Sequence, residues 1–416
     1  MKRIFPWLLL ACVLAYGWQA LGPWRARAWA GESARDFASY YYAVQVAAAG
    51  GDPYATKALG KQARAEGTRK SVHPFFYPPP FLAAFAWVLP FSLESAYHAW
   101  YWAEHLFLLA VLLALGRWVP DRGMALTLGL LAATFSPIAD NAWMGQANLV
   151  VLAVTVPGVL LAERGWEKAG GALVGLACML KMSPALLVAW WLLHRRWRPA
   201  LAAVLAAVFL SVAALPLADI KVQWAFFTEV LPGFAAGRYH GLTVPITLTH
   251  NHSIPSLLHE VLGGGKSTTL LPAAGWISRI VTLAVLGGLA WCFRHRPTDP
   301  LDALCQAGAV VVPMLVLPVY TYEHHMVWML VPYAAAFAAL RAGRLPRGWW
   351  VALVLAYAIQ ALPLDWLKAL YPHLRGLGSL RDFVYYPLRE SKFVAALVVG
   401  IACALASRPG AERPAA

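Results

Sequence analysis

Long apolar runs, broken by short polar stretches, cover most of the chain. A helix needs about 20 apolar residues to cross a bilayer, so runs near that length predict membrane spans. The runs lie at residues 4–22, 79–92, 96–116, 124–138, 147–162, 170–193, 199–218, 271–292, 302–319, 325–340, 348–363 and 393–407. The pattern predicts an all-α polytopic membrane protein with about 12 transmembrane helices.

The positions of Lys and Arg then set the orientation of these spans, because cytoplasmic loops are enriched in both. With the N-terminus inside, an even number of spans brings five basic groups to the cytoplasmic side: Lys2 and Arg3; Arg195, Arg196 and Arg198; Arg294 and Arg296; Arg341, Arg344 and Arg347; Arg408 and Arg413. Two pairs fall on the outer side, Arg117 with Arg122 and Arg164 with Lys168. A miscounted or re-entrant pair of spans between residues 79 and 170 therefore stays open.

Two long connections, residues 23–78 and 219–270, lie on the outer side in this count, and a shorter one lies at 364–392. Connections of this length without a domain of their own usually carry function. We expect residues 1–416 to form a single integral membrane domain, with catalysis in the first outer loop and substrate binding in the second.

Composition agrees with a membrane location. Of the 416 residues, 60% are hydrophobic and only 13% are charged, and the mean hydropathy is +0.57. Soluble domains are about half apolar and a quarter charged, so a soluble enzyme is excluded. The net charge of +14 does not indicate nucleic acid, because cytoplasmic loops and membrane lipids account for basic residues between apolar runs.

The first apolar run has two interpretations. Lys2 and Arg3 before it and Ala28-Trp29-Ala30 after it also fit a cleaved signal peptide. The apolar core continues past the usual signal-peptide length, which favours an uncleaved first span. The orientation is the same in both cases.

The first outer loop contains a helical pattern. Its aromatic and apolar residues recur at helical spacing from Asp36 onward: Phe37, Tyr40, Tyr41, Val44 and Ala48. With eight basic residues in the same loop, this predicts an amphipathic helix that lies in the membrane interface beside lipid phosphates. The alternative is a solvated loop with a small core of its own. Asp36, at the start of this helix, is either a functional carboxylate or an N-cap.

Three other groups of polar residues are candidates for function. Lys181 lies inside the apolar run at 170–193, where an ionisable residue indicates function unless its side chain extends to the interface. Pro184 is expected to break the helix there. His324 and His325 lie at the outer end of a span, where they are suited to binding an anion or are simply interfacial. Gln146 and Asn148 lie at a span terminus, and interhelical hydrogen bonding alone explains them.

Taken in order, several segments resemble the polyprenyl-phosphate-mannose-dependent mannosyltransferases of glycosyltransferase family 87, which have the C-type glycosyltransferase fold. The segments are Asp36-Phe37 with Tyr40-Tyr41; Gly51-Asp52-Pro53-Tyr54; Tyr77-Pro78-Pro79; Gly145-Gln146-Ala147-Asn148; Lys181 through Pro184; Asn251-His252-Ser253; and His324-His325-Met326-Val327-Trp328. Together they extend over about three quarters of the chain. The sequence departs from the family pattern after Ser253, where an arginine is expected and His259 and Glu260 stand.

The resemblance implies an inverting transfer of a sugar, mannose in this family, from a polyprenyl-phosphate donor to a lipid or glycan acceptor at the outer face of the inner membrane. It maps the catalytic aspartate onto Asp36 and implies that one histidine of the pair His324 and His325 contacts the donor phosphate. Substrate binding is expected at the other polar residues of these segments, namely Tyr40, Tyr77, Gln146, Asn148, Lys181 and Asn251. No metal or other cofactor is expected, because a phosphate leaving group needs no general acid. The oligomeric state stays open.

Two rival classes of function remain. A secondary transporter would use Lys181 as a substrate site near the midplane of the membrane. The spacing of the spans shows no internal repeat, which disfavours this class. A non-catalytic membrane scaffold would leave Asp36 and the two histidines unexplained.

Overall fold

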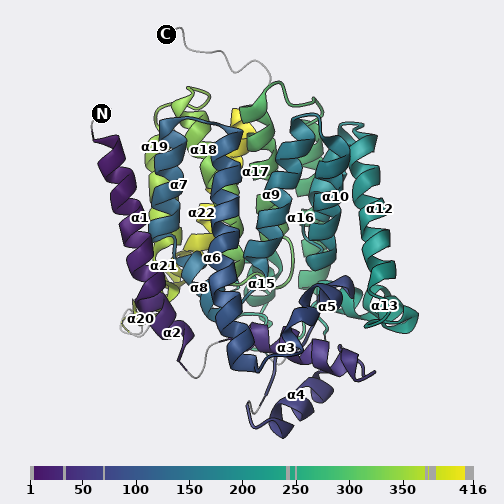
Figure 1. Ribbon diagram of the computed structural model, residues 1–416. Helices are drawn as coiled ribbons and strands as arrows, with labels where there is room; N and C mark the ends of the chain where they lie inside the picture. Colours follow the sequence, from purple (N-terminus) through teal and green to yellow (C-terminus); the bar gives the residue numbers. More distant parts are fainter. Residues whose placement is uncertain are drawn as a thin grey trace.

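The computed structural model describes residues 4–30, 34–68, 71–239, 244–248, 251–370, 373 and 381–407. In this part of the chain every regular element is helical (Figure 1). The helices that form the upright bundle are α1 (Phe5–Leu21), α6 (Leu93–Trp118), α7 (Arg122–Thr134), α9 (Asn148–Glu163), α10 (Glu167–Leu180), α11 (Ala185–Leu193), α12 (Trp197–Ala213), α16 (Pro272–Cys292), α17 (Pro300–Val316), α18 (Leu330–Arg341), α19 (Trp349–Ala361) and α22 (Ser391–Ala406).

Short helices make up most of the connections between them. They are α2 (Pro23–Ala28), α3 (Arg35–Ala48), α4 (Thr56–Ala65), α5 (Pro80–Phe85), η1 (Ala86–Val88), α8 (Ser136–Met144), α13 (Ile220–Ala225), η2 (Phe226–Val230), α14 (Leu231–Ala235), α15 (Ile254–Val261), η3 (Glu323–Met329), α20 (Leu364–Leu370) and α21 (Arg381–Arg389). Figure 1 shows α3, α4, α5 and α13 at the lower end of the bundle, opposite the start of α1.

Among the described residues, three stretches are long and apolar enough to cross a membrane: Phe5–Ala28, Leu93–Trp118 and Pro272–Cys292. Two bent pairs, α7 with α8 and α19 with α20, raise this number to five. Four further apolar helices, α9, α12, α17 and α22, are shorter. The prediction of an all-helical, membrane-embedded protein is confirmed, whereas the count of 12 spans stays a prediction.

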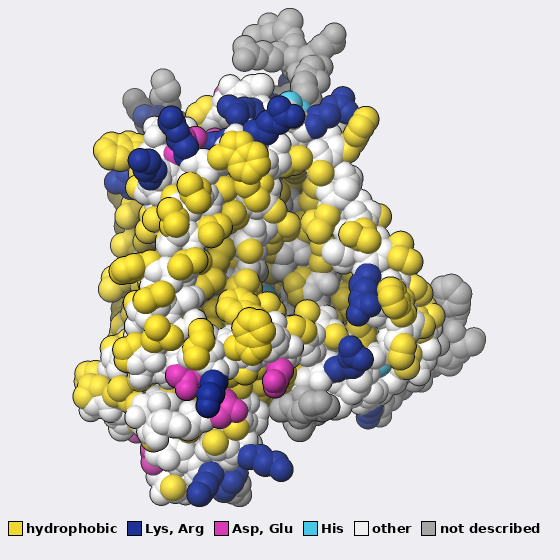
Figure 2. Space-filling model, turned by 90° about the vertical axis from the view of Figure 1, so that its right-hand side faces the viewer, with side chains coloured by type: hydrophobic (Ala, Val, Ile, Leu, Met, Phe, Trp, Pro, Cys, Tyr) yellow, Lys and Arg dark blue, Asp and Glu magenta, His cyan; other side chains and the backbone are white. Residues whose placement is uncertain are grey.

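Basic residues gather at the end of the bundle where α1 begins, which we call the basic end. There, the Arg164 side chain donates to the Arg117 carbonyl (2.6 Å), and Arg296 donates to the His194 carbonyl (3.0 Å). Arg341 approaches Asp121, beside the start of α7, at 3.6 Å. Figure 2 shows a row of Lys and Arg along the top of one face and apolar side chains over its middle, with further Lys and Arg in its lower half. We call the opposite end the site end.

The predicted span at residues 79–92 is wrong. This segment forms the six-residue helix α5 and the three-residue η1, at the site end, and then α6 runs from the site end to the basic end. Its apolar residues Phe81, Leu82, Phe85 and Val88 are buried in the protein core. An apolar run of this length is as suited to protein packing as to lipid, and here it packs within the protein.

The predicted single span at 170–193 is also wrong, although the expected break at Pro184 is present. Helix α10 ends at Leu180 and α11 begins at Ala185. Helices α10 and α12 lie in close parallel contact, since a Cβ added to Gly171 or Gly175 would overlap the backbone of Pro199 or Ala203. Because both start at the basic end, α11 must return to that end, so α10 and α11 are antiparallel with Lys181 at the turn between them.

These two corrections move the two basic pairs that the sequence count had put on the outer side to the same end as the other basic groups. Arg117, Arg122, Arg164 and Lys168 all flank turns at the basic end, together with the other described basic groups. Lys2, Arg3, Arg408 and Arg413 lie outside the described residues, as do Arg69 and Lys70 of the first loop.

The helix predicted from Asp36 onward is confirmed as α3, but it does not lie on a surface. All residues from Phe37 through Val44 are buried. Phe37 and Tyr40 pack their rings against Phe85, and Phe37 also contacts Trp100 of α6. The aromatic residues that suggested a lipid-facing helix are therefore part of the main protein core, which fixes α3 rigidly.

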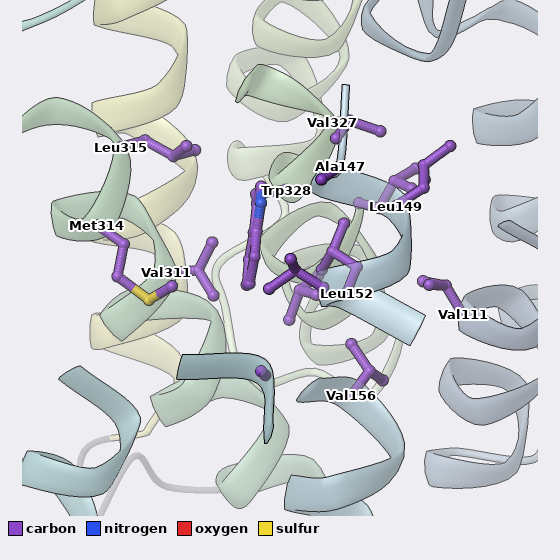
Figure 3. Close-up of a cluster of buried hydrophobic side chains, with 14 of the residues drawn as sticks. Val111, Ala147, Leu149, Leu152, Val156, Val311, Met314, Leu315, Val327 and Trp328 are labelled. Atoms are coloured by element: carbon purple, nitrogen blue, oxygen red, sulfur yellow. The ribbon is translucent and has the colours of Figure 1, made fainter. Parts of the chain in front are cut away.

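A second part of the core holds η3 against the start of α9. Figure 3 shows Trp328 of η3 between Val311 of α17 and Leu152 of α9, with Ala147 and Val327 beside them. All five side chains are buried. The polar residues next to this core, on α9 and η3, are thus positioned by close-packed apolar neighbours.

Candidate active site

Asp36 lies in the first turn of α3, with both carboxylate oxygens engaged. Nδ1 of His73 lies 2.7 Å from Oδ1, and the Gln146 amide Nε2 donates to Oδ2 at 2.7 Å. The helix begins at Arg35 and its N-cap residue is Ala34, so the interpretation of Asp36 as an N-cap is wrong. The side chain is 14% exposed. Asp36 is thus a nearly buried carboxylate held by residues from two distant segments.

A tight turn presents Gln146 to this carboxylate. Gly145 ends α8 with a φ of 67°, in the left-handed region, and a Cβ there would lie 2.6 Å from Cβ of Phe37. Only glycine suits such a position without strain. The turn places the Gln146 amide between Asp36 and two tyrosines.

The tyrosines fix which way the Gln146 amide points. Tyr40 and Tyr77 donate to Oε1 of Gln146 at 3.1 and 2.9 Å, and their hydroxyls are 2.7 Å apart. An ionised carboxylate can only accept, so Nε2 must face Asp36 and Oε1 must face the hydroxyls. Burial raises the pKa of both tyrosines, which keeps them as neutral donors.

The surroundings also keep Asp36 ionised. Burial raises the pKa of its carboxyl, but the hydrogen bond and charge of His73, the charge of His324 and the Gln146 amide outweigh burial. The pKa of Asp36 is therefore held below its ordinary value. At neutral pH the group is a carboxylate able to accept a proton.

Lys181 approaches the site from the turn between α10 and α11. Its Nζ donates to Oδ1 of Asn148 at 2.6 Å and lies 5.8 Å from the centre of the Tyr77 ring. Asn148 donates in turn to Asn141 (3.0 Å) and to the His324 carbonyl (3.1 Å). The lysine is therefore not an isolated group in the bundle but part of the network around Asp36.

A buried carboxylate stands behind this network. Glu104 of α6 accepts a hydrogen bond from Asn141 at 3.1 Å, and the Asn141 amide also donates to the Gln146 carbonyl at 3.2 Å. Glu104 and Asn141 are both fully buried. They tie α6, α8 and α9 together beneath the residues that face the site.

The two histidines have different surroundings. His324 acts electrostatically on Asp36, and His325 is within electrostatic reach of Lys181. His325 also accepts a hydrogen bond at Nδ1 from the backbone N–H of Tyr322 (2.9 Å), which caps η3. Their rings are 4.4 Å apart. His325 is thus engaged with the backbone at Nδ1, and both rings lie beside the Asp36 cluster.

Asn251 lies apart from this cluster. Its amide donates to the carbonyls of Ile246 (3.0 Å) and Val319 (2.8 Å), and its Oδ1 accepts from the Thr321 backbone (3.0 Å). These bonds fasten the connection at residues 219–270 to the segment that leads into η3. Its predicted role in substrate binding stays a prediction.

Neighbouring charges fasten the same segment from another side. Glu323 of η3 pairs with Lys392, which is fully buried, and accepts a hydrogen bond from His252 at 3.1 Å. Glu260 is one of the two residues found where the family pattern has an arginine. It forms an ion pair with Arg389. The second outer loop, η3 and the start of α22 are thus locked together next to His324.

The structure brings together eight of the nine residues predicted from the sequence: Asp36, Tyr40, Tyr77, Gln146, Asn148, Lys181, His324 and His325. Three polar residues were missed, namely His73, Glu104 and Asn141. Glu104 gave a signal, because an acid inside an apolar run indicates function. His73 gave none beyond its position four residues before Tyr77.

Comparison with known proteins finds glycosyltransferases among those similar to this chain. The chain is 28% identical over 283 residues to a polyprenol-phosphate-mannose-dependent alpha-(1-2)-phosphatidylinositol mannoside mannosyltransferase of Mycobacterium tuberculosis, a match that covers 62% of this chain and 60% of the relative. It is 28% identical over 385 residues to the protein of the same name from Mycolicibacterium smegmatis, covering 85% of this chain and 79% of the relative. An alpha-(1->3)-arabinofuranosyltransferase of Mycobacterium tuberculosis is 30% identical over 176 residues, which cover 41% of this chain and 36% of that enzyme.

A sequence model of one glycosyltransferase family also matches the chain. The model of glycosyltransferase family 87 matches residues 75–318, more than half of the chain. This segment contains five of the predicted site residues, Tyr77, Gln146, Asn148, Lys181 and Asn251. The resemblance first seen in scattered motifs is confirmed, and the chain belongs to glycosyltransferase family 87.

Proposed function

We propose that the protein is an inverting glycosyltransferase that moves a sugar from a polyprenyl-phosphate donor to a glycolipid or glycan acceptor. The observation that carries the proposal is the Asp36 carboxylate, which is held on both oxygens and kept ionised. Lys181 and His324 supply positive charge on neighbouring elements. The site thus offers one base and, beside it, groups that can receive a phosphate.

This arrangement supports a direct displacement. The acceptor oxygen forms a bond to the anomeric carbon, and the bond from that carbon to the phosphate oxygen breaks with its electron pair on the phosphate. The acceptor proton passes to Asp36, acting as general base. Lys181 and His324 stabilise the charge that develops on the departing phosphate. A single carboxylate is sufficient, because the phosphate leaves without a general acid and no covalent glycosyl-enzyme intermediate has to form.

The named relatives support the donor and suggest an acceptor. Two of them are described as dependent on polyprenol-phosphate-mannose and as acting on phosphatidylinositol mannoside. We extend these properties to this chain: the donor sugar is mannose and the acceptor is a glycolipid. The arabinofuranosyltransferase matches a smaller part of the chain and carries less weight for the sugar.

The position of basic residues supports the orientation. Counting α10 and α11 separately and omitting residues 79–92, we propose that the twelve upright helices form one membrane domain with the C-type glycosyltransferase fold. The basic end then faces the cytoplasm, and the first outer loop, 23–78, brings Asp36 to the periplasmic face of the inner membrane. The second outer loop, 219–270, completes the substrate site.

The shape of the molecule supports a lipid-linked donor. The face that carries α12 and α16 is covered by apolar side chains and has a hollow running through its middle (Figure 2). Exposed residues on these helices include Leu205 and Phe209 of α12 and Ile280 and Leu283 of α16. A polyprenyl chain can lie along such a surface while its phosphate reaches the site.

The transporter alternative has no such support. Lys181 donates to Asn148 and lies close to Tyr77, in the same network as Asp36. It therefore does not form a separate substrate site at the middle of the bundle.

The experiment uses the purified full chain in lipid nanodiscs with labelled mannosyl polyprenyl phosphate and phosphatidylinositol mannoside. We expect transfer from this donor and none from a nucleotide-linked mannose, with the opposite anomeric configuration in the product. Transfer from the nucleotide sugar alone would overturn the donor assignment. Retention of the anomeric configuration would overturn the single-displacement mechanism.

A further inference from the structure

His73 contacts the nearly buried carboxylate of Asp36 and is itself partly exposed at the protein surface. It belongs to the segment that connects α4 with α5, and its Nδ1 lies 2.7 Å from Oδ1 of Asp36. The His73 side chain is 44% exposed, whereas that of Asp36 is 14% exposed. The carboxylate is thus shielded, but the imidazole in contact with it can exchange protons with the medium.

The chemistry of the pair fixes which nitrogen carries the proton. An ionised carboxylate has only acceptors, so the Nδ1 of His73 must donate. In the neutral imidazole the second nitrogen, Nε2, is then a base. Protonation at Nε2 produces an imidazolium whose positive charge lies directly beside Asp36.

We propose that His73 is the positioning residue for the base Asp36 and that its own protonation controls how strong that base is. The inference rests on the proposed function, in which Asp36 accepts the acceptor proton. With neutral His73, the Nδ1–H bond orients the carboxylate and places no full positive charge beside it. With protonated His73, the added charge lowers the affinity of Asp36 for the acceptor proton, so the transfer becomes slower.

Among the described residues, other titratable groups act on Asp36 from several elements. Lys181 on the α10–α11 turn and His324 on η3 interact electrostatically with Asp36. The hydroxyls of Tyr40, Tyr77 and Tyr322 also lie within its electrostatic reach. The tyrosines stay neutral in the acid range. Lys181 and His324 remain when His73 is replaced, so a comparison of variants separates their effect from that of His73.

The expected pH dependence follows from the sign of this charge. As the pH falls through the range in which His73 gains its charge, kcat/KM falls. As the pH rises through the same range, kcat/KM rises to a plateau. Without a titrating residue at position 73, the fall should shift to the range in which carboxylates are protonated, at least about one pH unit lower.

The test compares pH profiles of the purified full chain and its variants with the labelled donor and acceptor. His73→Asn keeps an N–H at the place of Nδ1 but cannot titrate, so we expect a plateau within about tenfold of the wild type and loss of the acid limb. His73→Ala loses the hydrogen bond as well, and its plateau should be about tenfold lower again. His98→Asn is the matched control, because His98 is a histidine at the same end, stacked on Trp29, and outside the site. Its profile should equal that of the wild type.

The outcomes separate this inference from the proposed function. If His73→Asn keeps the acid limb of the wild type, the limb belongs to another group and the inference is wrong. If His73→Asn does not fold, His73→Gln supplies a second neutral amide, and the same loss of the limb is required. Transfer by Asp36→Asn at the wild-type rate would instead remove the proposed base itself, whatever the profiles of the His73 variants.

Discussion

Lys181 offers a test in which the contribution of charge can be separated from that of packing. Its Nζ forms a 2.6 Å hydrogen bond to Asn148, and it lies at the turn between α10 and α11. Lys181→Met keeps the length of the side chain but removes both the charge and the donor. The charge stabilises the departing phosphate, and loss of one such preorganised group costs roughly 10² to 10³ in kcat, about 2.7–4 kcal/mol of transition-state stabilisation.

The same change leaves Oδ1 of Asn148 without its donor, which costs about 1–3 kcal/mol of folding stability when the group is buried. Lys181→Gln separates the two effects, because its amide can still donate to Asn148 but carries no charge. We therefore expect kcat to fall in both variants. Only Lys181→Met should also lose the whole of this amount, about 1–3 kcal/mol for the unpaired Asn148 oxygen, from its folding stability.

The assay measures kcat for labelled sugar transfer at saturating donor, together with the thermal unfolding of each variant in nanodiscs. Lys61→Met is the matched control, since Lys61 is an exposed lysine on α4, and it should leave kcat unchanged. A folded Lys181→Gln protein with near-normal kcat would refute the assignment of Lys181 to the phosphate.

Two further changes test the geometry of the site. Gly145→Ala introduces a Cβ 2.6 Å from Phe37 at a φ of 67°, so thermal unfolding should occur at lower temperature and turnover should fall; an unchanged unfolding temperature would contradict the close approach. His324→Ala should lower kcat by roughly 10², whereas His325→Ala should cost much less, because His325 accepts a hydrogen bond from the Tyr322 backbone. Equal losses in the two histidine variants would show that the structure does not distinguish them.

Hydropathy predicted most of the upright helices correctly, because long apolar runs in this chain are helices of the bundle. It failed at residues 79–92, where Phe81 and Phe85 are buried by protein, since composition does not distinguish burial in lipid from burial in a protein core. It also failed at 170–193, where apolar residues on both sides of Lys181 concealed a turn. The misplaced basic pairs had indicated a miscounted span between residues 79 and 170, but they did not indicate the turn inside 170–193.

The site was predicted from motifs and not from periodicity. Gln146 and Asn148 were accounted for by interhelical contacts alone, yet the turn at Gly145 directs Gln146 to Asp36. His73 lies in a segment without regular structure, so no periodic pattern could indicate its contact with Asp36. That contact depends on how the first outer loop folds back on α3, which is a long-range property of the fold.

The most direct measurement of the central claim is sugar transfer by Asp36→Asn. The asparagine keeps its carbonyl toward Gln146, and its amide can donate to His73 once the imidazole moves its proton to Nε2, so the fold and donor binding should be preserved. Without a carboxylate to take the acceptor proton, transfer should fall by at least 10², within the range of roughly 10² to 10⁴ for loss of a general base. Near-normal transfer by a folded, donor-binding Asp36→Asn protein would contradict the account.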